Sequence, residues 1–163
     1  MNLINLEMNI GKMNTNPISI NDIITQLKTI PDSEILWNNP IDIHRIIAFE
    51  EKYQLKLPQD YKDFLLQTNG LFVLGDEILG FSTETNIYAI EETFWDEHYD
   101  VDNEMPYYLI PFSPDGFGNH YCFDTLNNKI VFWQHDLDYT KIQPEIVYDN
   151  FIEFMQKQIL ELY

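Results

Sequence analysis

The spacing of hydrophobic positions predicts four amphipathic helices, because apolar residues recur there at intervals of three and four residues. The expected helices cover residues 18–30, about 40–53, 58 to about 68, and 149–163. Ser19 or Asn21 can cap the first helix, and Pro31 ends it. Asn39 and Asp149 are the expected caps of the second and fourth helices.

The second and third helices are close in sequence and are joined by Leu57-Pro58. Proline suits the first turn of a helix, where its missing N–H costs nothing, and glycine tolerates the left-handed conformation that ends one. Leu57-Pro58 therefore predicts a start and Asn69-Gly70 a stop. Glu50 is expected to face solvent. The expected inward residues of these two helices are Ile43, Ile46, Ile47, Tyr61, Phe64 and Leu65, with Phe49 and Tyr53 as further candidates.

After Gly70 the pattern changes to short apolar runs separated by turn residues, which is typical of β-strands. The expected strands are residues 71–74, 77–82, 86–90, 107–112, 120–124 and 129–133. The last two flank a four-residue turn and predict a hairpin, and residues 113–119 predict another turn. Residues 91–106 contain seven acidic and no basic residues, so we expect a long loop or a short helix there.

This order of elements predicts an α+β fold, with N-terminal helices and a C-terminal helix packed around a mixed, mainly antiparallel sheet of about six strands. Residues 18–163 are expected to form a single domain, since no repeat or linker divides them. Residues 1–17 form a polar, Asn-rich lead-in for which the sequence leaves both an ordered and a flexible state open.

We expect a cytoplasmic protein. The N-terminus lacks the basic region and apolar core of a signal peptide, and no apolar run approaches transmembrane length. Cys122 is the only cysteine of the 163-residue chain, which excludes an intramolecular disulfide and favours a reducing compartment.

Charge narrows the classes of partner. The net charge of −18 argues against binding of nucleic acid or of an anionic membrane, because both require basic patches. The charge is also uneven: residues 1–70 carry net −3, and residues 71–163 carry net −15. This asymmetry favours a basic partner for the second half, although a solubilising surface is the ordinary explanation of such charge.

The segment 91–104 combines aromatic side chains with carboxylates, as an interface for a basic protein would. The alternative is that Phe94, Trp95 and Tyr99 are core residues that anchor a solvated loop. We predict that the partner-binding residues are Glu91, Glu92, Trp95, Asp96, Glu97, Tyr99, Asp100 and Asp102, with Asp136 and Asp138 as a neighbouring patch.

Candidate catalytic and metal chemistry is less well supported. On a strand, His120, Cys122 and Asp124 would share one face, but neighbours two apart rarely converge on one reacting atom, and a free Cys is usually a small buried hydrophobe. One Cys does not make a structural zinc site, and the acidic run 96–104 lacks the glycine of a calcium loop. The sequence therefore predicts no catalytic residues, no metal site and no cofactor.

A set of core and turn positions resembles the SUKH superfamily, which groups the Smi/Knr-type fungal cell-wall regulators with many bacterial immunity proteins. The resemblance covers about residues 43–160. The residues that carry it are Leu57-Pro58-x-x-Tyr61-x-x-Phe64-Leu65, Asn69-Gly70, Gly118-Asn119-x-x-Cys122-Phe123-Asp124, Ile130-Val131-Phe132-Trp133, His135-Asp136 and Asn150-Phe151-x-x-Phe154.

The resemblance implies an α+β fold without a catalytic motif and, for bacterial members, the neutralisation of a co-produced toxin, often a nuclease. We therefore expect a non-catalytic immunity protein that binds a basic toxin domain through its acidic half. A regulatory scaffold of the cell-wall regulator type, acting through an endogenous protein partner, is the alternative. A hydrolase that uses Cys122 or His135 is a third, weaker hypothesis.

Overall fold

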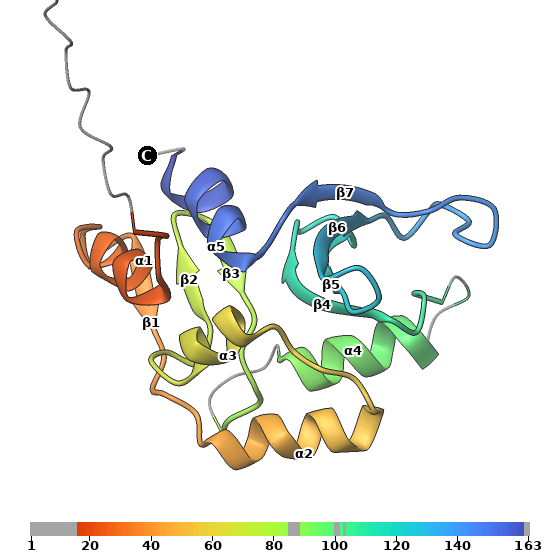
Figure 1. The fold of residues 1–163 in the computed structure, drawn as a ribbon, viewed down its shortest axis with the longest axis horizontal. Coiled ribbons are helices and arrows are strands. Elements are labelled where there is room, and N and C mark those ends of the chain that lie inside the picture. The colour runs from red at the N-terminus through yellow and green to blue at the C-terminus, as the bar shows by residue number, and fades with distance from the viewer. Residues whose placement is uncertain (1–15, 85–88, 100–101, 103, 162–163) are drawn as a thin grey trace, which may run out of the picture.

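The structure is a computed structural model that describes residues 16–84, 89–99, 102 and 104–161 (Figure 1). It has the expected α+β class, which is confirmed. In chain order the elements are α1 (Ile20–Leu27), β1 (Ile35–Trp37), α2 (Ile43–Tyr53), α3 (Gln59–Leu65), β2 (Leu71–Val73), β3 (Asp76–Ile78), α4 (Ile90–Tyr99), β4 (Leu109–Pro114), β5 (His120–Asp124), β6 (Lys129–Trp133), β7 (Glu145–Tyr148) and α5 (Phe151–Phe154), which continues as the wider π-helix η1 (Met155–Leu160).

The strands form two antiparallel sheets, one of three strands in the order β1-β2-β3 and one of four in the order β4-β5-β6-β7. The two sheets are joined where β3 runs past β4. There the N–H of Leu79 donates to the carbonyl of Phe112 at 2.8 Å, and the Ser113 hydroxyl donates to the carbonyl of Glu77 at 2.7 Å. The expected single sheet is thus divided into two sheets that share a hydrogen-bonded seam.

An aromatic cluster at the centre of the main core holds the helices to both sheets. The Tyr61 ring of α3 lies 4.9 Å from Phe123, 5.2 Å from Phe151 and 6.1 Å from Phe112, measured between centroids. The Tyr61 hydroxyl donates to the carbonyl of Leu79 beside the seam. Each of these buried rings removes a large apolar area from water, so the cluster is a principal source of stability.

The first helix follows its sequence signals closely. Ser19 caps α1 in a capping box with Asp22, in which each side chain binds the backbone N–H of the other residue. The apolar positions predicted for one face, Ile20, Ile23, Ile24 and Leu27, are all buried.

The second helix differs from expectation at both its start and its exposed face. Asp42, rather than Asn39, caps α2, and Ile43 and Ile47 are exposed, so of the three inward isoleucines predicted there only Ile46 is buried. Glu50, expected in solvent, is only 5% exposed.

The burial of Glu50 has a physical cause that lies outside its own helix. Its carboxylate binds the Lys56 ammonium at 2.9 Å and the Lys62 ammonium at 3.2 Å, and it accepts the backbone N–H of Leu57 at 2.9 Å. Burial raises the pKa of Glu50, but these three donors outweigh it and hold the pKa below its ordinary value. Glu50 therefore fixes the connection between α2 and α3.

Two strands were not expected, and several boundaries differ from the prediction, among them those of β3 (expected at 77–82) and β4 (expected at 107–112). β1 lies in a segment interpreted as a connector, and β7 fills the stretch before the last helix, which is capped by Asn150 rather than Asp149. Residues 86–88 of one expected strand lie outside the described residues, and Ile90, its last residue, begins α4. The hairpin β5–β6 matches its prediction at both ends.

The Asn69-Gly70 pair does more than end α3. Gly70 has φ +72°, and a Cβ there would lie 2.4 Å from the carbonyl oxygen of Ile78, so only glycine fits. The Asn69 amide donates to the carbonyl of Phe81 at 2.8 Å and accepts the N–H of Phe81 at 2.7 Å. The Asn69-Gly70 pair thus also holds the end of α3 against the segment that follows β3.

Candidate protein-binding surface

The inward face of α4 anchors this helix to the core and to β4. Ile90, Phe94 and His98, spaced four residues apart, are buried, and Phe94 meets the α2 residue Phe49 edge-on at 5.5 Å. The ring nitrogens of His98 lie 2.7 Å from the carbonyl of Phe94 and 3.2 Å from that of Pro106. Burial lowers the pKa of His98, which favours the neutral ring.

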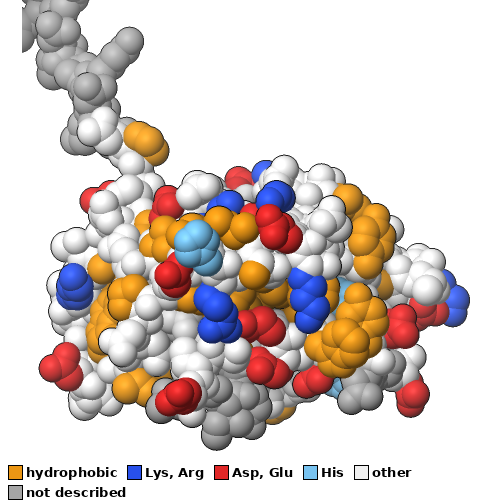
Figure 2. All heavy atoms as spheres, turned by 90° about the horizontal axis from the view of Figure 1, so that it is seen from below, with side chains coloured by type: hydrophobic (Ala, Val, Ile, Leu, Met, Phe, Trp, Pro, Cys, Tyr) orange, Lys and Arg blue, Asp and Glu red, His pale blue; other side chains and the backbone are white. Residues whose placement is uncertain are grey.

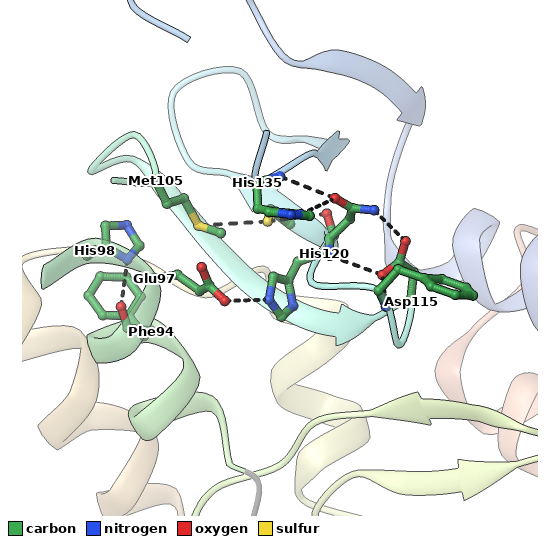
Figure 3. Close-up of polar contacts among 10 residues, drawn as sticks. Phe94, Glu97, His98, Met105, Asp115, His120 and His135 are labelled. Carbon is green, nitrogen blue, oxygen red and sulfur yellow. Dashed lines mark hydrogen bonds and ion pairs between the residues drawn. The ribbon is translucent and has the colours of Figure 1, made fainter. Parts of the chain in front are cut away.

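Two predicted partner-binding residues, Glu91 and Glu97, also hold α4 against neighbouring elements. The Glu91 carboxylate accepts from the Arg45 guanidinium at 2.7 Å and from the N–H of Ser82 at 2.9 Å. Glu97 lies 2.9 Å from the Nε2 atom of His120 on β5, as Figure 3 shows. These carboxylates are engaged within the chain, so their first role is to position the helix.

Four predicted residues form one outward row, the α4 stripe: Glu92, Trp95, Asp96 and Tyr99. Their spacing of three, four and seven residues places them on one side of a helix. Trp95 is 51% and Tyr99 57% exposed, and their ring centroids lie 4.7 Å apart. Figure 2 shows the side of the molecule that carries α2 and α4, where exposed hydrophobic side chains border acidic ones.

The carboxylates of the α4 stripe are available to a partner. Glu92 and Asp96 are exposed and make no hydrogen bond or ion pair with another described residue. Of the three aromatics of this segment, Phe94 belongs to the core and Trp95 and Tyr99 face outward. Phe94 is therefore a core residue, and a binding role for Trp95 and Tyr99 stays a prediction.

The remaining predicted residues are less clearly grouped. Asp100 lies outside the described residues, and Asp102 and Asp136 are exposed. Asp138 is held by the Lys141 ammonium at 2.6 Å and by Thr140, which lower its pKa to about 2. No hydrogen bond or ion pair between described residues joins Asp136 or Asp138 to α4, so a patch that includes them stays a prediction.

The catalytic interpretation of Cys122 finds no support in the geometry. Its thiol is fully buried, lies 3.9 Å from the sulfur of Met105, and donates to the backbone carbonyl of His120. Burial raises the pKa of the thiol well above its ordinary value, which disfavours the thiolate. The Asp124 carboxylate instead accepts the N–H groups of the β5–β6 turn.

A cleft beside α4 places Glu77, for which the sequence predicts no binding role, next to the predicted residues Asp96 and Glu97. It measures about 440 Å³ and lies between α4 and the β4–β5 turn, with Glu77, Asp96, Glu97 and His120 among its lining residues. Glu77 carried no sequence signal, because it reaches this cleft only through the pairing of β3. The turn itself is built as expected, around the Asp115 carboxylate and its bonds to Asn119.

The described residues contain neither a cluster of metal ligands nor a helix that could span a membrane. Within these ranges no group of three or more His, Cys, Asp or Glu residues is placed to hold a metal ion. Nor does any described helix combine the length and apolarity needed to cross a bilayer.

Comparison with known proteins places this geometry in context. A family model described as SMI1-KNR4 cell-wall (SUKH_6) matches residues 43–155. An uncharacterized SPbeta prophage-derived protein, YokK of Bacillus subtilis (strain 168), is 26% identical over 71% of this chain and 78% of its own. The crystal structure of a protein from Pseudomonas syringae pv. tomato superposes with a TM-score of 0.62 over 86% of this chain and 98% of its own, at 19% identity, which shows a shared fold.

Proposed function

This chain belongs to the SMI1-KNR4 cell-wall family (SUKH_6), whose members are generally non-catalytic, and from that premise we propose that it is an immunity protein. In this proposal it acts in the cytoplasm, without a cofactor, and neutralises a toxin by binding it. The partner is a basic toxin domain, with a nuclease as the expected kind, because enzymes that handle nucleic acid need basic clefts.

The observation that carries the proposal is the α4 stripe. Trp95 and Tyr99 stand half-exposed and side by side on a helix whose opposite face is fully anchored. Exposed aromatic pairs of this kind supply large buried areas in interfaces, and Glu92 and Asp96 flank them as a polar rim. The helix is held at Glu91 and Glu97, so binding would require little ordering of the backbone.

Charge supports a basic partner over a neutral one. The chain carries net −18, and residues 71–163, which include α4, account for net −15 of it. The electrostatic field of this negative charge accelerates encounter with a positively charged domain. The charge also mimics that of the domain's nucleic-acid substrate. The field steers association, and the aromatic pair then determines how long the complex lasts.

The test is a protection assay with the product of the adjacent reading frame. Co-expression should rescue growth with the wild-type chain and fail with the double variant Trp95→Ala/Asp96→Lys. Affinity measured by calorimetry should fall by about 100-fold or more, since an aromatic hot spot and a charge reversal are combined. Tyr107→Ala and Glu145→Lys, which alter an exposed aromatic and an exposed acid elsewhere, should retain protection.

Two results would contradict this assignment. If the double variant protects as well as the wild type, the α4 stripe is not the interface. If the adjacent product is not toxic and the chain captures a component of the cell's own wall-regulating machinery through the same stripe, the regulatory scaffold is the correct function. The family's cell-wall description is the observation that keeps this second candidate in view.

A further inference from the structure

Carboxylates are the main charged groups that line the cleft between α4 and the β4–β5 turn. Glu77, Asp96 and Glu97 contribute carboxylates, His120 contributes its ring, and the described lining residues include no Lys or Arg. Its volume of about 440 Å³ falls within the usual range of ligand-binding clefts. A ligand for such a site should bring donors and positive charge.

Glu77 is the least compensated of these carboxylates. It lies on β3 and is half-buried, and its carboxylate makes no hydrogen bond or ion pair with another described residue. Burial alone raises its pKa above the ordinary value for Glu. A cation placed beside the Glu77 carboxylate would compensate for the hydration that burial removes.

His120, in the wall of the cleft, has a buried ring atom that lacks a hydrogen-bond partner among the described residues. Its ring is more than nine-tenths buried and points from β5 towards α4 (Figure 3). Nε2 faces the Glu97 carboxylate at 2.9 Å, so this nitrogen is already engaged. Nδ1 has no hydrogen-bond partner among the described residues, which is unusual for a buried polar atom.

An apolar surface lies next to this cleft on the outer face of the three-stranded sheet. Glu77 is paired with Phe72 across β2 and β3, and Phe72 with Leu36 across β1 and β2, so the three side chains share one face. Phe72 is 48% and Leu36 65% exposed. A shallow depression, lined in part by these two residues and by Asp32 and Glu34, adds further acids at its margin.

We propose that the cleft receives an arginine or lysine side chain of the protein partner, and that an apolar residue of the same partner segment packs on Phe72 and Leu36. Lysine and arginine carry only donors, which the carboxylates of Glu77 and Asp96 can accept. The inference rests on the proposed function, since it assumes a basic protein partner. It adds a second contact region, built from β1, β2 and β3, to the α4 stripe.

The test uses a blocked peptide, acetyl-Leu-Arg-Leu-amide, titrated into the ¹⁵N-labelled full chain, with acetyl-Leu-Gln-Leu-amide as the neutral probe. The arginine peptide should shift the amides of Glu77, Gly116 and Gly118 and saturate with a Kd of about 1 mM, as expected for a small ligand. Glu77→Gln should weaken this binding about tenfold. Phe72→Ser should weaken it several-fold.

Two matched variants serve as controls. Glu145→Gln and Ile146→Ser alter an exposed acid and an exposed apolar residue on β7, away from the cleft, and should leave the Kd unchanged. Circular dichroism of each variant confirms that it is folded. The proposal is overturned if the neutral peptide binds equally well, if Glu77→Gln has no effect, or if about 10 mM peptide produces no shift.

A divalent cation is the competing ligand for an acidic cleft. If CaCl₂ or MgCl₂ shifts the same amides at lower concentration than the peptide does, the site binds metal and the proposal is wrong. A separate measurement distinguishes this inference from the function on which it rests. If the adjacent gene product binds with equal affinity to Glu77→Gln and to the wild type, the cleft assignment fails while the immunity role stands.

Discussion

The helices α3 and α4 both carry aromatic residues, but α3 buries both of its own, whereas α4 buries Phe94 and leaves two others facing outward. Tyr61 and Phe64 of α3 are fully buried in the aromatic core, whereas Trp95 and Tyr99 of α4 stand half-exposed. The difference comes from the elements around each helix. α3 is enclosed by α1, α5 and the seam between the sheets, whereas only one side of α4 is packed, against α2 and β4.

The charged residues near the two helices follow the same division. Glu50, beside α3, is buried and bound by two lysines and one backbone N–H. Asp96 on α4 is exposed and makes no such bond within the described part of the chain. Around α3, therefore, charge stabilises the fold, whereas on α4 it remains available for another molecule.

The largest expected effect on stability distinguishes α3 from α4 when one aromatic residue on each helix is replaced by alanine. Tyr61→Ala should lower the free energy of unfolding by about 3–5 kcal/mol, because it opens a cavity in the core and leaves the Leu79 carbonyl without its donor. Trp95→Ala should change it by no more than about 0.5 kcal/mol. Urea denaturation measures both, and a loss above about 2 kcal/mol for Trp95→Ala would show that the α4 stripe is structural.

A smaller effect is expected when one carboxylate from each region is neutralised. Glu50→Gln should cost about 1–3 kcal/mol, because three donors lose a charged acceptor, and Glu92→Gln should be nearly neutral. Since the pKa of Glu50 is lowered by folding, its contribution is present above the unfolded value of 4.5 and is lost as the pH falls through the folded value.

The wild type and Glu50→Gln should accordingly converge in stability as the solution is acidified from neutral pH to below the folded pKa of Glu50. Chemical denaturation at a series of pH values checks this convergence. A stability difference that stays constant over the whole range would mean that the two lysines do not respond to the charge of Glu50.

The smallest effect concerns His98 on the inward face of α4. Burial lowers its pKa in the folded chain below the unfolded value of 6.5, so the unfolded chain takes up a proton first as the pH falls. Stability should therefore drop between neutral pH and the folded pKa of His98, and His98→Leu should show a flatter profile. An equal slope for both proteins over this interval would contradict the assigned role.

The sequence predicts those parts of the fold whose signals are local. The β5–β6 hairpin and α1 were located correctly because a turn, a capping residue and a hydrophobic period lie within a few residues of one another. β1 was missed because its three residues are too few to show a period, and its partner β2 lies more than thirty residues away. Sheet pairing over such distances leaves no local pattern.

The sequence predicts which residue types belong to the candidate interface, but not which way their side chains point. Residue types alone placed Trp95 and Asp96 in a candidate interface, and only the fold shows that Glu91 and Glu97 turn inward to Arg45 and His120. Glu77 shows the limit most clearly. It is a single acid on a short strand, and its place beside α4 follows from the seam between the two sheets.

The separation between the anchored and the outward side of α4 has an evolutionary consequence. Substitutions at Glu92, Trp95, Asp96 and Tyr99 disturb no hydrogen bond, ion pair or core contact among the described residues apart from the ring contacts at Trp95 and Tyr99. Substitutions at these four positions can therefore accumulate under selection with little loss of stability. A lineage that meets a new partner can change its specificity here while it inherits the rest of the domain intact.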